Sequence, residues 1–289
     1  MAEEKKSDTK KRGKPEKLPD LTVKNLDGIS KMEEDDDGYK PAHPLLPNQN
    51  NFRCLVVGPS GCGKTNFVVN YICRFMKVDR LYVLSKHLQQ DKFEFLHKHF
   101  TEIENAINKK LRAKKKPENF KIIMSWTNEL PLFPVVDDLD KNYRNVVIFD
   151  DIIFEPDKNE KVANYFVRSR HKNCSLFYLS QTMFAIPRKI RLNTTHYVLY
   201  NMPSLTEVSR IHKEVASDLT KDEFIRYFKE AIDDEDTYDF FFIDTLQKKK
   251  WLKYRKNLDG LLIDPVKPKK ESKKIQISSS SESDDETED

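Results

Sequence analysis

The amino-acid sequence predicts an α/β protein in which helices enclose a mainly parallel β-sheet. Three observations predict it: strand-like and helix-like segments alternate along the chain, several strand-like segments are continuous apolar runs, and a glycine-rich turn joins the first strand to the first helix. Continuous apolar runs suit strands that are covered on both faces. Alternation favours parallel strands joined by right-handed crossovers. We therefore expect a three-layer α/β/α sandwich.

Seven strands are expected, each a short run rich in β-branched and aromatic residues. In chain order their apolar centres read LVV, LYVL, IIM, VVIF, LFYL, YVLY and FFFI. The corresponding segments are 53–58, 78–85, 121–126, 145–152, 174–181, 195–201 and 239–245.

Five helices are expected between these strands. Their apolar residues recur at steps of three and four, which is the spacing of one helix face. The segments are 65–76, 90–112, 158–169, 204–216 and 221–232.

Tails of different composition flank this domain. Residues 1–50 carry few long apolar side chains, and the segment after Pro265 turns from basic (KPKKESKK) to serine and acid (SSSSESDDETED). Such segments bury too little apolar surface to offset the entropy of ordering. We predict a disordered N-terminal segment at 1–50, one domain at 51–264, and a disordered basic-then-acidic tail at 265–289.

Composition also limits the compartment. The four cysteines show no Cys-x-x-Cys spacing and no cleavable signal precedes them, which indicates free thiols in a reducing compartment rather than a secreted protein. No apolar run reaches the roughly 18 residues of a membrane span. The net charge of +4 includes the acidic tail, so the domain itself is more basic than the total suggests. A basic domain fits a polyanionic partner, but basic side chains are also common on an ordinary solvated surface.

The glycine-rich turn is GPSGCGKT, which holds three of the seven glycines of the chain. It fits G-x-x-x-x-G-K-[ST], the phosphate-binding P-loop or Walker A motif, and it lies between a strand and a helix as that motif requires. Its backbone N–H groups and the helix N-terminus would surround a phosphate. We predict ATP and Mg²⁺ as cofactors, with Lys64 on the β- and γ-phosphates and Thr65 on the metal. The predicted nucleotide-binding residues are Gly58, Pro59, Ser60, Gly61, Cys62, Gly63, Lys64 and Thr65.

The strand-like run 146–149 ends in two carboxylates, Asp150 and Asp151, as a Walker B motif does. Carboxylates at the C-terminal end of a parallel strand emerge at the ligand-binding edge of the sheet. Asp150 is expected to hold Mg²⁺, and Asp151 to polarise the attacking water as general base. Adjacent strand residues point to opposite faces, so both can reach one site only if the chain turns there. In the alternative interpretation, Asp151 only caps the next segment.

The strand 174–181 ends in Ser180 and Gln181. If this strand lies between the P-loop strand and the Asp150 strand, Gln181 would face the γ-phosphate and orient the attacking water. Otherwise the glutamine faces a loop.

A basic cluster, RSRHK at 168–172, precedes the same strand. Arg168 or Arg170 could supply an arginine finger to a neighbouring subunit, because a guanidinium neutralises charge on the transferred phosphoryl group. The cluster could equally grip DNA phosphates, or be a solvated helix end. The basic residues of IPRKIR, at 186–191, are open to the same DNA interpretation or to that of an ordinary charged helix face.

Four segments together, GPSGCGKT, VVIFDD, YFVRSRHKNCSLFYLSQ and IPRKIRLNTTHYVLYN, resemble the DNA-packaging ATPases of poxvirus-like large DNA viruses, virophages and Maverick/Polinton elements, in the FtsK–HerA branch of the P-loop ATPases. The resemblance covers roughly 50–245. It implies an ATPase that assembles as a homo-oligomeric ring and drives double-stranded DNA, irrespective of sequence, into a preformed capsid.

The resemblance also implies roles and places. Lys64 and Thr65 would bind the nucleotide, Asp150 the metal, Asp151 would be the base and Gln181 the sensor. Arg170, then Arg168, is the expected finger. A viral capsid or portal-like vertex would be a partner, and the site of action the host nucleus, a cytoplasmic viral factory or the virion.

Two other functions fit the same motifs. A ring-type helicase or an AAA-like remodelling ATPase would use the same nucleotide site, whereas a two-lobed helicase needs a second motor domain that the chain is too short to hold. A nucleotide-binding scaffold without hydrolysis would leave Asp151 idle.

Overall fold

The computed structural model describes residues 43, 45, 46, 51–152, 159–232 and 238–265. The predicted tails at 1–50 and 265–289 therefore lie almost wholly outside the described residues. Every expected strand forms within a few residues of its predicted bounds: β1 Arg53–Val57, β2 Arg80–Ser85, β3 Ile123–Thr127, β4 Asn145–Asp150, β5 Cys174–Ser180, β6 His196–Leu199 and β7 Phe241–Asp244. Two more follow, β8 Tyr254–Lys256 and β9 Gly260–Leu261.

These strands form a single sheet in the order β3-β2-β4-β5-β1-β6-β7-β8-β9. The first six strands in that order are parallel to one another. The remaining pairings, from β6–β7 onward, are antiparallel. The mainly parallel sheet predicted from the sequence is confirmed.

The five expected helices are also present: α1 Lys64–Phe75, α2 Asp91–Ala113, α3 Asn159–Arg168, α5 Leu205–Val215 and α6 Lys221–Ala231. Shorter ones were not predicted: α4 Arg188–Leu192, α7 Lys250–Lys253, and the 3₁₀ turns η1 Leu130–Leu132, η2 Val136–Asp138 and η3 Ser169–Lys172. One turn or so is too short to show a helical period. None of the helices in the described ranges is both long and apolar enough to cross a membrane.

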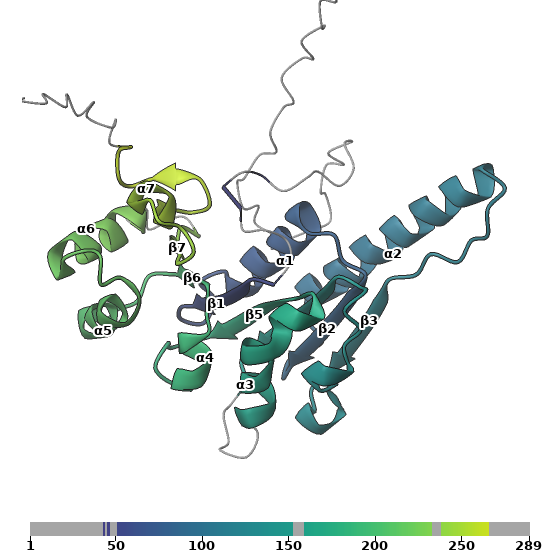
Figure 1. The fold of residues 1–289 in the computed structure, drawn as a ribbon, viewed down its shortest axis with the longest axis horizontal. Helices are drawn as coiled ribbons and strands as arrows, with labels where there is room; N and C mark the ends of the chain where they lie inside the picture. The colour runs from purple at the N-terminus through teal and green to yellow at the C-terminus, as the bar shows by residue number, and fades with distance from the viewer. Residues whose placement is uncertain (1–42, 44, 47–50, 153–158, 233–237, 266–289) are drawn as a thin grey trace, which may run out of the picture.

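Helices cover both faces of the sheet, as Figure 1 shows. On one face, Val68 and Ile72 of α1 pack with Leu96 of α2 and with Val56 of β1. On the other, side chains of α3, α5 and α6 pack with the alternate residues of the strands, such as Leu55. The period-two alternation of β1 thus supplies two apolar cores, one on each face, and the three-layer sandwich is confirmed.

The core on the α1 and α2 face extends ahead of the predicted domain start. Leu46 is buried in it and Leu45 packs against it. The boundaries at 51 and 264 stay predictions, because the residues beyond them are mostly outside the described ranges.

The parallel arrangement gives the sheet two functionally different edges. All six parallel strands end at one edge, which we call the carboxyl edge, and begin at the opposite one, the amino edge. Because β7 is antiparallel to β6, the chain leaves β7 at the amino edge. Ligands of such sheets bind at the carboxyl edge.

Candidate nucleotide site

The turn between β1 and α1 has the conformation for which its glycines are needed. Gly61 and Gly63 have φ values of 79° and 101°, where a residue with a Cβ atom is strained. Gly58 is needed for space, because a Cβ there would lie 2.6 Å from the Cβ of buried Tyr200. Pro59, Ser60 and Gly61 are exposed at the tip of the loop.

Lys64 folds back over this loop. Its Nζ donates to the carbonyl oxygens of Gly58 and Pro59, each at 2.8 Å. Lys64 is also the first residue of α1, where backbone N–H groups lack partners inside the helix. The loop therefore combines an ammonium and a helix N-terminus, the two features that favour an anion.

Asp150 lies at the carboxyl end of β4 and is 6% exposed. Its Oδ2 accepts a hydrogen bond of 2.9 Å from the Ser85 hydroxyl, and the Gln90 amide makes a longer contact of 3.5 Å with the same atom. Burial raises the pKa of this carboxyl, and Ser85 partly offsets that effect by stabilising the charged form.

Sequence reasoning did not find Ser85 or Gln90. Ser85 ends β2, and it lies opposite Asp150 in the register of the β2–β4 pair. A serine at the end of an apolar run, followed by a helix start, was the only signal. It becomes informative only once β2 is known to neighbour β4.

Asp151 has a φ of 49°, in the left-handed region that few non-glycine residues adopt. Its backbone N–H donates to the Leu179 carbonyl at 3.2 Å, so the chain turns at this residue while still attached to β5. The turn allows the exposed Asp151 and the buried Asp150 to serve one edge. Since α3 begins only at Asn159, Asp151 does not cap that helix.

Gln181 lies where the sequence predicts it. β5 is between β1 and β4 in the sheet, which is the position that the proposed role of Gln181 requires. Its Nε2 donates to Asp151 Oδ2 at 3.2 Å, and the preceding residue, Ser180, accepts from the Gly58 N–H at 3.2 Å. Gln181 is therefore tied to the carboxylate on one side and adjoins the P-loop on the other.

The predicted arginines are not part of this cluster. Arg168 and Arg170 directly precede β5, so they lie at the amino edge, opposite the P-loop of their own chain. Arg168 pairs with Asp137, and Arg170 Nε contacts His171 Nε2 at 3.1 Å. Neither can act on the nucleotide of its own subunit.

The IPRKIR segment divides between two roles. Arg191 is mostly buried and pairs with Glu214, Nε to Oε1 at 2.7 Å, so it holds α4 against α5. Arg188 and Lys189 are exposed.

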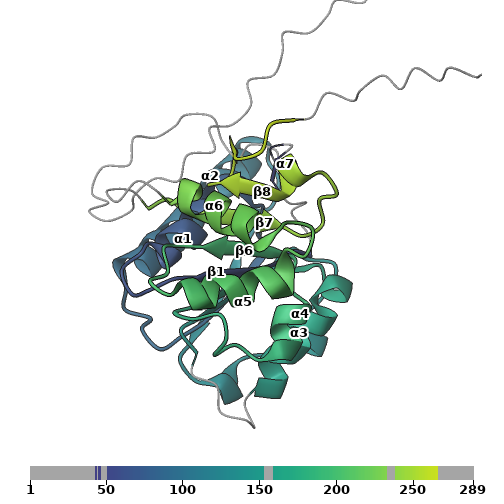
Figure 2. The ribbon, with the colours of Figure 1, turned by 90° about the vertical axis from the view of Figure 1, so that its left-hand side faces the viewer.

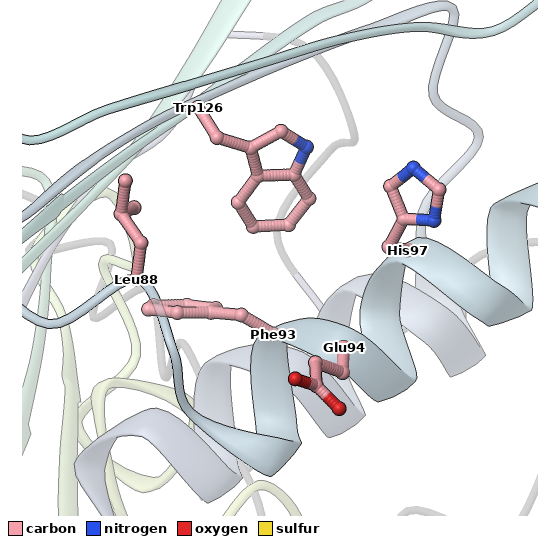
Figure 3. Close-up of a pocket in the computed structure, with 5 residues that line it drawn as sticks. All are labelled: Leu88, Phe93, Glu94, His97 and Trp126. Carbon is pink, nitrogen blue, oxygen red and sulfur yellow. The ribbon is translucent and has the colours of Figure 1, made fainter.

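A cavity of about 280 Å³ lies beside the loop that carries Gln90. Figure 3 shows Trp126 of β3 facing Phe93 and His97 of α2, and the ring centroids of Phe93 and Trp126 are 5.7 Å apart. Leu88 and Glu94 complete the lining. No P-loop residue lines this cavity, which is therefore separate from the phosphate cradle.

Comparison with known proteins gives one family and a set of distant structures. The family described as Poxvirus A32 protein matches residues 45–243, more than half of the chain. No curated protein sequence matches.

Three solved structures illustrate the structural similarity. The genome packaging NTPase B204 of Sulfolobus turreted icosahedral virus 2, in complex with AMPPCP, is 12% identical over 74% of this chain and 100% of its own, with a TM-score of 0.44. B204 of Sulfolobus turreted icosahedral virus, described as a DNA-packaging ATPase, is 9% identical over 74% and 100%, with a TM-score of 0.41. The pCW3 conjugation coupling protein TcpA is 14% identical over 67% and 57%, with a TM-score of 0.36.

Proposed function

This chain belongs to the Poxvirus A32 protein family, and we propose that it is a packaging ATPase of the FtsK–HerA type that hydrolyses ATP to move double-stranded DNA into viral capsids. The observation that carries the proposal is the convergence of Lys64, Asp150, Asp151 and Gln181 on one edge of the sheet. Four residues from three separate strand ends meet there, with the chemistry that phosphoryl transfer to water requires.

The same edge has the oxygen donors that Mg²⁺ prefers. Asp150 directs Oδ2 to Ser85, and its Oδ1 has no hydrogen-bond partner among the described residues. The Thr65 hydroxyl, at the start of α1, likewise has none there. These two oxygens fit the ion, which would neutralise charge on the phosphates of a bound nucleotide.

The protein's own groups divide the remaining work. Lys64 would exchange its two carbonyl partners for phosphate oxygens. Asp151 would accept the proton of the attacking water, and Gln181, bonded to Asp151, would hold that water in line.

An arginine finger must come from a neighbouring subunit. Arg170 is the first candidate and Arg168 the second, because both lie far from their own P-loop. Mixing Arg170→Ala protein with Lys64→Ala protein tests this role: a wild-type Arg170 from one subunit would face an intact P-loop of the next. Recovered ATP turnover in mixtures supports it, whereas no recovery at any ratio removes Arg170 from the role.

Assembly, docking and location complete the proposal. The need for a finger in trans supports a homo-oligomeric ring, which the mass of the native particle in solution would test. Docking on a capsid or portal-like vertex, in the host nucleus or a cytoplasmic viral factory, follows from the packaging role.

The test of the function itself is ATP turnover with and without linear duplex DNA. Asp151→Asn is the control that keeps the fold and removes the base. Turnover that rises with DNA and disappears in Asp151→Asn supports a DNA motor, and turnover indifferent to DNA contradicts it. Movement along intact duplex, rather than strand separation, distinguishes a packaging motor from a ring-type helicase.

A further inference from the structure

Three basic segments, distant in sequence, meet at the amino edge of the sheet, and we propose that they bind the phosphate backbone of duplex DNA. We call this surface the basic edge, and its six principal residues are Arg170, Lys172, Arg188, Lys189, Lys248 and Lys249. The inference rests on the proposed DNA motor and identifies the face with which the subunit contacts the duplex.

The sheet topology brings the three segments together. Residues 168–172 lead into β5, and 188–191 lead towards β6. Residues 248–253 follow β7, whose antiparallel direction returns the chain to the same edge. Thr195, just before β6, accepts from the Thr245 N–H at 3.0 Å, which places the end of β7 beside the start of β6. In Figure 2, α4 and α7 lie on the same, right-hand side of the molecule.

The charge of these segments has one sign. Residues 168–172, 188–195 and 245–253 contain ten lysines and arginines and no aspartate or glutamate. Carboxylates from other segments interact with four of these ten side chains. Arg168 pairs with Asp137, Arg191 with Glu214 and Lys253 with Asp218, and Lys250 interacts with Glu223. The six residues of the basic edge have no ion pair with any described carboxylate.

Like charges are also held close together there. Arg53, at the start of β1, is half-buried, and its Nε has no hydrogen-bond partner among the described residues. Burial, and then the nearby charge of Arg170, lower the pKa of Arg53. Two neighbouring cations without a carboxylate repel each other, and an anion between or above them would offset that repulsion.

The size of the edge suits a DNA backbone. β5, β1, β6 and β7 are consecutive strands about 4.8 Å apart, so the edge from β5 to β7 spans about 14 Å. The phosphates of one DNA strand recur about every 3.4 Å along the helix axis, so the edge can contact more than one of them at once. Lysines bind phosphates as point charges and read no base sequence, as a packaging motor requires.

The experiment compares two triple variants of the full chain. Lys189→Gln, Lys248→Gln and Lys249→Gln together remove three exposed charges of the basic edge. Lys114→Gln, Lys115→Gln and Lys116→Gln remove three exposed charges from the loop after α2, at the far end of the sheet. Binding of a labelled linear duplex is measured by fluorescence anisotropy over a range of salt concentrations, beside ATP turnover without DNA.

We expect the basic-edge variant to bind DNA at least about tenfold more weakly at 0.1 M salt, and its salt dependence to decrease by about 2 to 3 in log–log slope. The control variant and the DNA-free turnover of both stay close to wild type, because the nucleotide site lies at the opposite edge. As a second readout that needs no variant, chemical labelling of Lys248 and Lys249 in the wild-type chain decreases when duplex is bound.

Equal affinity and slope in the two triple variants, or unchanged labelling of Lys248 and Lys249, overturns the basic edge while the DNA motor stands. Wild-type protein that binds no duplex at all contradicts the proposed function itself. Arg170 is unchanged in both variants, so the result does not depend on its role as a finger.

Discussion

Gln181 and Asp151 are joined by a hydrogen bond of 3.2 Å from the glutamine amide to the carboxylate, across the ends of two neighbouring strands. The bond fixes the position of the proposed base relative to the proposed sensor. A water held by both would stand in front of the phosphate cradle. Because both side chains lie at the same point, their positions alone do not separate the role of one from the role of the other.

The pair is expected to act as one unit in catalysis. Asp151→Asn should lower kcat about 100-fold or more, and Gln181→Ala should have an effect of similar size, because a positioned base contributes about 10² to 10⁴. The double variant should be little worse than either single one, since residues that act together are not additive. The kcat values and the Kd for a fluorescent nucleotide check this, and additive losses in kcat would contradict it.

Ser85 is expected to keep the buried Asp150 carboxylate charged and oriented. Ser85→Ala leaves that carboxylate with one long contact, and should cost about 1 to 3 kcal/mol of unfolding free energy and raise the Mg²⁺ concentration for half-maximal turnover. Ser85→Thr retains the hydroxyl and serves as the control. Equal magnesium dependence in Ser85→Ala and wild type would refute this positioning role.

Substitutions of the P-loop glycines are expected to weaken nucleotide binding for different reasons. Gly58→Ala places a methyl group 2.6 Å from Tyr200 Cβ, so nucleotide affinity should fall at least tenfold. At Gly61 there is open space, and only its φ of 79° opposes a side chain, at about 1 to 2 kcal/mol. Gly61→Asn should then be the mildest change, because asparagine adopts this conformation more readily. Nucleotide Kd values for the variants measure the difference, and a harmless Gly58→Ala would show that the loop can move away.

A salt bridge at the amino edge predicts acid sensitivity. Arg144 donates to both Asp79 oxygens, at 2.8 and 2.6 Å, and these hydrogen bonds lower the pKa of Asp79. A lowered pKa in the folded state means that the stabilisation is present above the unfolded value of about 3.9 and is lost as the pH falls through the folded value. Because the pair is partly solvated, we expect at most about 1 kcal/mol.

The corresponding measurement is denaturant unfolding of wild type and Asp79→Asn at pH 7, 5 and 3. The difference should persist at pH 7 and 5 and shrink at pH 3. A difference that does not change with pH would show that another interaction is responsible.

Trp126 should report on the nucleotide site. Leu88 lines the cavity of Trp126, and Gln90, two residues later, contacts Asp150, so events at Asp150 reach the cavity through one short loop. In a Trp251→Phe background, leaving Trp126 as the sole tryptophan, emission should change on addition of ATP and Mg²⁺. A Lys64→Ala version should not respond, and a silent Trp126 at saturating nucleotide would disprove the link.

The order and type of the main elements could be predicted from the sequence. Apolar runs such as VVIF and the three- and four-residue steps of the helices are local patterns, so they can be recognised without the tertiary structure. The phosphate-binding turn could also be predicted from the sequence, because Gly58, Gly61 and Gly63 meet requirements of space and φ that belong to the turn itself. The short α4 and α7 were missed because four or five residues show no period.

Neighbour relations between strands could not be read in the same way. The contact of Ser85 with Asp150 and that of Gln181 with Asp151 both depend on the order β2-β4-β5-β1. That order is set by which apolar faces pack best across the whole sheet, a sum over residues far apart in the chain. Local patterns therefore identify the catalytic groups, and long-range packing determines which of them meet.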